Sequence, residues 1–166
     1  MTARRWILLA EDNPNDADLA LRALATQQPP SEVVLAADGE EALDRLYQRG
    51  AFRSSDHGLP AVVLLDLKMP KVDGLEVLRQ IKNDAALRHI PVVVFTSSSE
   101  GTDLTRTYQL GVNAYVVKPL GFQEFVAVLK DVRKFWLTIN ELPPVELTIC
   151  AQMPVRLAAA EPAQVV

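Results

Sequence analysis

The sequence predicts a doubly wound α/β fold, in which a five-stranded parallel sheet is flanked by helices. Short apolar runs recur along the chain and are typical of strands buried on both faces. Segments whose apolar residues follow helical spacing separate these runs. Such alternation of strands and helices favours parallel strands joined by crossover helices.

Each element has a local signal. Asn13 and Pro14 are typical of a helix start, with a capping side chain followed by proline in the first turn. Asp38-Gly39 and Asp73-Gly74 begin two further helices. We expect strands at residues 6–10, 32–37, 61–65, 91–95 and 113–117. We expect helices at residues 14–27, from 39, from 74, at 101–110 and at 121–136.

Two segments exceed a minimal domain of five such units. Residues 48–60 form a polar, glycine-containing loop before the third strand. After the last helix, Val145, Leu147 and Ile149 alternate with more polar residues, which is the period of a strand. We therefore predict one domain over residues 1–139, followed by a C-terminal extension or arm, partly flexible, over residues 140–166.

Composition narrows the class of protein. The 166 residues carry a net charge of −4 without a basic cluster, so binding to nucleic acid is not expected. Cys150 is the single cysteine, which rules out an intrachain disulfide and suits a reducing cytoplasm. No apolar run reaches the ~18 residues of a membrane span. We expect a cytoplasmic protein that does not enter the membrane.

Charged residues follow three of the predicted strands. Glu11 and Asp12 come after the first strand, Asp66 after the third and Lys118 after the fifth. The carboxyl ends of parallel strands form one edge, where ligand sites lie. Three acids there supply the oxygen ligands that Mg²⁺ prefers, and Mn²⁺ suits the same donors. The sequence thus predicts a site for a divalent metal and a phosphoryl group.

Two further features belong to this edge. Pro119 follows Lys118, and a cis bond before proline costs only ~0.5–1 kcal/mol. We expect a cis-proline that turns the Lys118 ammonium toward the acids. Thr96 follows the fourth strand and brings a hydroxyl to the same place.

Together, Glu11-Asp12, Asp66 within DLKMPKVDG, Thr96 and Lys118-Pro119 resemble the receiver domain of two-component response regulators. The resemblance covers residues 5–136 and implies the flavodoxin-like receiver fold. It also implies a phosphorelay protein, rather than an enzyme, that accepts a phosphoryl group from a sensor histidine kinase and loses it slowly.

The roles implied by the resemblance are carried over residue by residue. Asp66 resembles the phosphoacceptor. The metal would be held by Asp12, Asp66 and the Lys68 backbone carbonyl, with Glu11 acting through water. Thr96 and Lys118 resemble the groups that bind the phosphoryl oxygens, and Thr96 and Tyr115 resemble the activation switch.

A narrower resemblance rests on the 48–60 loop and on residues 135–137 and 141–143. These look like the small regulators of phytochrome-type sensor kinases. The sequence contains no helix-turn-helix after the domain, so we expect output through protein contacts. We expect the kinase to dock near the first helix, where apolar residues lie beside the site. These are Ala17, Leu19, Ala20 and Ala23.

The apolar pattern of the last helix predicts a homodimer. Val128 and Phe135 lie on a different face from its core stripe, and an apolar cluster of this kind suggests a partner. The C-terminal extension could add to that interface. The expected core stripe is Phe122, Phe125, Val126, Leu129, Val132 and Trp136.

Three other functions remain open. A phosphohydrolase with an aspartate nucleophile would need an acid where Lys68 stands. A flavin-binding protein would need a hydroxyl-rich phosphate loop where Glu11 and Asp12 stand. A phosphorylation-independent adaptor with the same fold is the strongest rival, and only the intact acids and lysine argue against it.

Overall fold

The computed structural model describes residues 5–26, 31–53 and 57–144. Five strands form one fully parallel sheet in the order β2-β1-β3-β4-β5, which confirms the predicted fold. The strands are β1 (Trp6–Ala10), β2 (Glu32–Ala36), β3 (Val62–Leu65), β4 (Val92–Thr96) and β5 (Ala114–Val117). The three central strands are buried along their length, as expected for a sheet covered on both faces.

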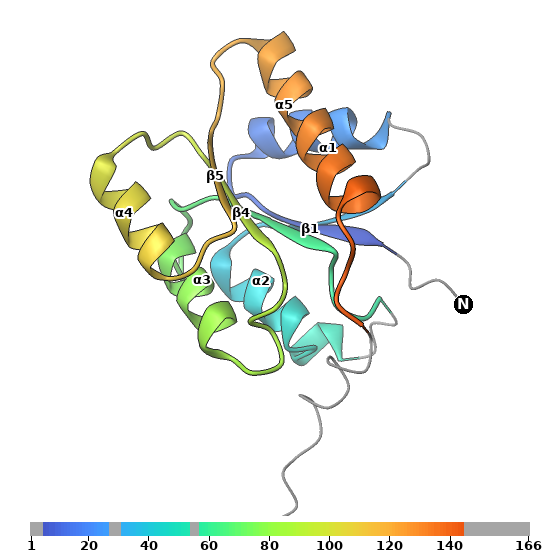
Figure 1. Cartoon of the computed structure of the whole chain (residues 1–166), viewed down its shortest axis with the longest axis vertical. Coiled ribbons are helices and arrows are strands. Elements are labelled where there is room, and N and C mark those ends of the chain that lie inside the picture. Colours follow the sequence, from blue (N-terminus) through green and yellow to red (C-terminus); the bar gives the residue numbers. More distant parts are fainter. Residues whose placement is uncertain (1–4, 27–30, 54–56, 145–166) are drawn as a thin grey trace, which may run out of the picture.

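Helices cover both faces of the sheet (Figure 1). One face carries α1 and α5 and the other carries α2, α3 and α4, so two separate apolar cores form. The helices are α1 (Pro14–Ala25), α2 (Gly39–Leu46), α3 (Gly74–Asn83), α4 (Gly101–Gln109) and α5 (Phe122–Lys134). None of the helices in these residues is long and apolar enough to cross a membrane.

The predicted helix starts are made by side-chain caps. Asn13 Oδ1 accepts the backbone N–H groups of the first turn of α1. Asp38 caps α2 and Asp73 caps α3 in the same way, each by accepting one backbone N–H three residues on. These bonds satisfy donors that the helix itself leaves without partners.

The register of the sheet brings the site residues to one edge. Ala10 lies beside Leu65, and Thr96 lies beside Val117. Backbone bonds continue the ladder by one residue: the Asp66 N–H donates to the Ala10 carbonyl at 3.0 Å and the Lys118 N–H to the Thr96 carbonyl at 2.7 Å. The side chains after these strands therefore start from neighbouring backbone positions.

The C-terminal part of α5 differs from prediction. The helix continues beyond Trp136 as a π-helical segment, Phe135–Ile139. Arg5 holds this segment, because its guanidinium donates to the Leu137 carbonyl at 2.8 Å. Phe122, expected in the core, is 66% exposed, since the chain has only just entered the helix at that point.

Three alanines of α1 are also placed differently from the expected docking surface. Ala17, Ala20 and Ala23 are buried against the rest of the fold, and only Leu19 of that set is partly accessible. Small side chains let α1 lie close to the sheet and α5, so these residues serve packing.

The predicted alternation at residues 145–149 lies outside the described residues. The loop at 48–60 contains a short 3₁₀ turn, Gly50–Phe52.

Candidate phosphoryl and metal site

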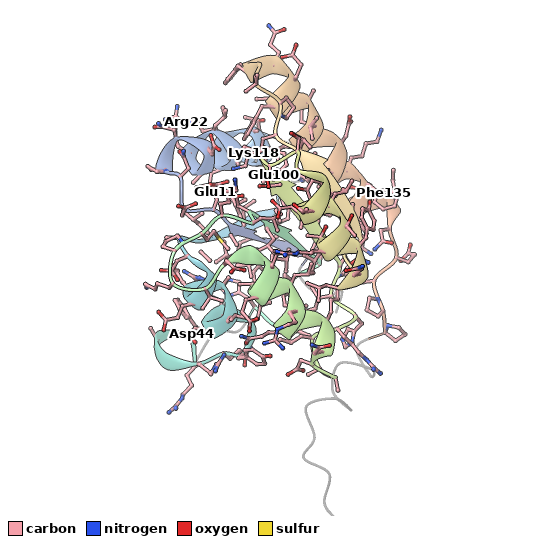
Figure 2. All side chains as sticks on the ribbon, turned by 90° about the vertical axis from the view of Figure 1, so that its left-hand side faces the viewer. Glu11, Arg22, Asp44, Glu100, Lys118 and Phe135 are labelled. Atoms are coloured by element: carbon pink, nitrogen blue, oxygen red, sulfur yellow. The ribbon has the colours of Figure 1, made fainter. Side chains whose placement is uncertain are left out.

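Lys118 is the centre of the site. Its Nζ donates to Glu11 Oε2 at 2.6 Å, to Asp66 Oδ2 at 2.8 Å and to Asp16 Oδ2 at 2.9 Å. Glu11 and Lys118 meet at the carboxyl edge of the sheet, and Figure 2 shows them close to α1. The predicted convergence of Glu11, Asp66 and Lys118 is thus present in the fold.

These charges are largely removed from water. Glu11 is 3% exposed, Asp66 7% and Lys118 8%. Burial raises the pKa of Glu11 to about 7, against the opposing effect of Lys118. Burial works to lower the pKa of Lys118, but hydrogen bonds to the carboxylates of Asp66, Glu11 and Asp16 raise it well above the usual lysine value. Lys118 therefore carries its charge throughout the physiological range.

The acids also form a group suited to a hard cation. Glu11, Asp12 and Asp66 each offer a carboxylate oxygen, and these oxygens lie within 4.8 Å of one another. Asp12 is exposed, so one side of the group is open to water, which Mg²⁺ commonly keeps among its ligands. Asp66 Oδ1 accepts only a long bond of 3.4 Å from the Lys68 N–H. The residues present fit a divalent metal with oxygen ligands.

Thr96 and Tyr115 meet at the turn between β4 and α4. Thr96 is fully buried, and its hydroxyl oxygen accepts the Ser98 N–H at 3.3 Å. The Tyr115 hydroxyl donates to the Ser98 carbonyl at 2.9 Å. The Ser98 hydroxyl in turn donates to Asp103 Oδ2 at 2.6 Å, inside the first turn of α4. Both expected switch residues are therefore bonded to one turn.

One member of this region, Asp16, is not indicated by the sequence. Asp16 is an acid in the first turn of α1, and nothing in its spacing indicates that its carboxylate reaches Lys118, 102 residues away. Ser98 is expected from the sequence to lie beside the phosphoryl position, within a run of serines typical of a turn, but its bonds to Thr96, Tyr115 and Asp103 are not indicated by that run.

The expected dimer residues lie elsewhere. Phe135, at the C-terminal end of α5, is 46% exposed and away from Glu11 (Figure 2). Val128 is half-buried and contacts the core beneath α1 and α5.

Residues 7–130 match the response regulator receiver domain family, and the chain belongs to that family. The probable methanogenesis regulatory protein FilR2 of Methanothrix harundinacea is 43% identical over 82% of this chain and 86% of its own. Response regulator Rcp1 of Synechocystis sp. is 37% identical over 82% of this chain and 92% of its own.

Solved structures point to the same class of regulator. The phosphorylated cyanobacterial phytochrome response regulator RcpA superposes with a TM-score of 0.81 at 40% identity, covering 86% of this chain and all of RcpA. The Mn²⁺-bound form of Rcp1 gives a TM-score of 0.79 at 36% identity, covering 84% of this chain and 99% of Rcp1. The bacteriophytochrome response regulator AtBRR gives 0.67 at 56% identity, covering 82% of this chain and 98% of AtBRR. This chain is a receiver-type response regulator that resembles those of phytochrome signalling, and receiver proteins are signalling proteins rather than classical enzymes.

Proposed function

We propose that Asp66 accepts a phosphoryl group from a sensor histidine kinase and that the labile acyl phosphate is the signal. The observation that carries this proposal is the Lys118 ammonium bonded to both Asp66 and Glu11 in a buried setting. A purely structural ion pair between Lys118 and Asp66 would not need a second buried acid, Glu11, and an exposed third acid, Asp12, beside it. The short contact between the Lys118 ammonium and the Asp66 carboxylate supports the proposal, because a cation there would offset the negative charge of the phosphoryl group.

The transfer is a displacement at phosphorus. An Asp66 carboxylate oxygen attacks, the bond from phosphorus to the imidazole nitrogen breaks, and its electron pair stays on that nitrogen. A bound Mg²⁺ or Mn²⁺ supplies positive charge that reduces repulsion between carboxylate and phosphoryl. Asp12, Asp66 and the Lys68 carbonyl would hold this metal, with Glu11 acting through water. Lys118 and Thr96 would bind phosphoryl oxygens, with a cis Pro119 holding Lys118 in place.

A direct test uses the protein, Mg²⁺ and a small phosphodonor such as acetyl phosphate. Wild type should gain one labile phosphate, and Asp66→Asn should gain none, since an amide is not a nucleophile. Asp44→Asn is the matched control, because Asp44 lies on α2 and pairs only loosely with Arg49 at 3.6 Å. Undiminished labelling of Asp66→Asn would overturn the assignment. Folded wild type that takes up no phosphate would instead favour the phosphorylation-independent adaptor.

Activation is proposed to run through Thr96 and Tyr115. A phosphoryl group adds three acceptor oxygens, and the Thr96 hydroxyl would leave the Ser98 N–H to donate to one of them. Tyr115 would then lose its bond to the Ser98 carbonyl and rotate. Converting a two-state equilibrium from about 1:99 to 99:1 requires ~5.5 kcal/mol, so Lys118 must contribute as well. A Tyr115 ring that keeps one rotamer with and without beryllofluoride, a phosphoryl mimic, would contradict this mechanism.

The proposed donor is a phytochrome-type histidine kinase in the cytoplasm. Support comes from the likeness to RcpA and AtBRR, which are named as a phytochrome response regulator and a bacteriophytochrome response regulator. Phosphotransfer should be measured from several purified histidine kinases, with and without a phytochrome sensor. Preference for a kinase that lacks such a sensor would refute the narrower claim and leave the phosphoacceptor role intact.

We also propose a homodimer through α5 and the segment after it. Phe135 and Ile139 expose apolar surface one turn apart at the end of this helix, 46% and 57% respectively. The domain would end near residue 139, and the C-terminal extension after it would add to the interface. Val128 would add to the same interface from α5. Phe135→Asp should give monomers in sedimentation, because a charge is costly to bury without a partner. Phe122→Asp, the same change at the other end of α5, should remain dimeric. A wild type that sediments as a monomer would rule out this assembly.

A further inference from the structure

The hydrogen bonds of Lys118 leave no donor free. A lysine ammonium has three N–H donors, and Glu11, Asp16 and Asp66 each accept one within 2.9 Å. For Lys118 to bind a phosphoryl oxygen as the proposed function requires, one of these bonds must break. The identity of the released acid affects how tightly a phosphoryl group is held.

The three acids differ in what release would cost. In the phosphorylated state Asp66 carries the phosphoryl group and is no longer a carboxylate, so Glu11 and Asp16 are the two acids that compete with the phosphoryl oxygens for Lys118. The side chain of Glu11 is 2% exposed, so a lost bond would leave a buried carboxylate without its counter-ion. The side chain of Asp16 is 35% exposed, so water can replace the ammonium. Of these two carboxylates, Asp16 is therefore the one that Lys118 gives up at lower cost.

The turn around Asp16 frees its carboxylate for this contact. Asp16 is the third residue of α1, the position from which Glu or Gln reaches back to the N–H of the capping residue in a capping box. Here the Asn13 N–H is taken by Glu11 Oε1 at 3.0 Å. The Asp16 carboxylate instead accepts a hydrogen bond from Lys118 Nζ at 2.9 Å.

We propose that Asp16 is a placeholder acid: it occupies the third donor of Lys118 in the resting state and competes with the phosphoryl group for it. Asp16 is then a positioning residue that acts through Lys118 and weakens phosphoryl binding. This inference rests on the proposed function and adds a determinant of how strongly the phosphorylated state is held.

The test measures binding of beryllofluoride, with Mg²⁺, to the full chain. Asp16→Asn keeps the side-chain shape and removes the competing charge, so binding should tighten about fivefold, the equivalent of about 1 kcal/mol for a partly exposed ion pair. Asp18→Asn is the matched control. It removes the same charge from the same helix, but Asp18 pairs with Arg22 at 2.9 Å and not with Lys118.

A second readout needs neither metal nor phosphoryl mimic. Unfolding of wild type, Asp16→Asn, Lys118→Met and the double variant in EDTA gives the coupling between the two side chains, and a favourable coupling is expected. Equal beryllofluoride affinity in Asp16→Asn and Asp18→Asn would overturn the inference, as would zero coupling. If wild type is labelled on Asp66 but Asp16→Asn binds beryllofluoride with wild-type affinity, only this inference fails. Wild type that takes up no phosphate would remove the proposed function, and this inference with it.

Discussion

Replacing Lys118 by methionine tests the electrostatic account of the site without any phosphodonor. Methionine keeps an unbranched side chain of similar length and removes the only cation bonded to Glu11 and Asp66 within the described chain. Breaking a buried ion pair by removing one partner costs about 3–5 kcal/mol. The structure supports a value in this range, because the two carboxylates are 3% and 7% exposed. That is a large part of the about 5–15 kcal/mol that stabilises a typical domain.

The loss of stability in Lys118→Met should grow as the pH rises, and the direction of this effect follows from the titration of Glu11. Its pKa in the folded protein is raised from 4.5 to about 7, so the unfolded chain releases this proton first. The contribution of Glu11 to the free energy of unfolding is fully present below pH 4.5 and is lost as the pH rises through about 7. Without Lys118, which lowers this pKa, the folded pKa rises further and the loss of stability continues into the alkaline range. The variant should therefore be closer to wild type at about pH 6 than at about pH 9.

Urea unfolding in EDTA at the two pH values measures this effect. Lys68→Met is the control, because Lys68 is an exposed lysine beside the same acids. Its removal should cost little at either pH, as is usual for exposed charges. A Lys118→Met protein that matches the control at about pH 9 would show that Lys118 is not the counter-ion of these buried acids.

Two further predictions concern the loops beside the site. A Cβ on Gly74 would overlap the Asp66 carbonyl, so Gly74→Ala should cost about 1–3 kcal/mol in urea unfolding and should slow labelling of Asp66. Gly101→Ala is the control, because its Cβ meets no atom within 4 Å, and it should be neutral or slightly stabilising. Equal stability of the two variants would contradict this prediction. A hydrogen bond from Lys71 lowers the pKa of Asp38, so this pair stabilises above about pH 4 and its contribution is lost as the pH falls further. Asp38→Asn keeps an acceptor for the helix cap and should lower the melting temperature more at neutral pH than at about pH 3. A deficit of the same size at both pH values would point to the cap instead.

Much of the site was predictable because it depends on strand ends. Apolar runs identified the strands, and in a parallel sheet the residue after each strand must lie at the carboxyl edge. That rule alone brought Glu11, Asp66, Thr96 and Lys118 together, although more than one hundred residues separate the first from the last. The helix starts were equally local, since a cap such as Asn13 acts within its own turn.

Features that depend on packing between elements needed the structure. The family resemblance and the apolar residues beside the site suggest a docking surface that includes Ala17, Ala20 and Ala23. Apolar character does not say which side chains meet the sheet and α5, and these alanines are buried. Phe122 is expected in the core as part of the apolar stripe of the last helix, but it lies exposed at the start of α5.

The sequence by itself determined the order of the elements, the parallel sheet and the acids with a lysine at one edge, because each follows from patterns within a few residues. Only the tertiary structure decided how the charges are shared at that edge. The reach of Asp16 to Lys118 depends on the angle between α1 and the sheet, and that angle is set by side-chain packing along the whole helix. The bond of Tyr115 to the Ser98 carbonyl likewise depends on where the turn before α4 lies against β5. Contacts of this kind join residues distant in sequence through side-chain geometry, which a linear pattern does not specify.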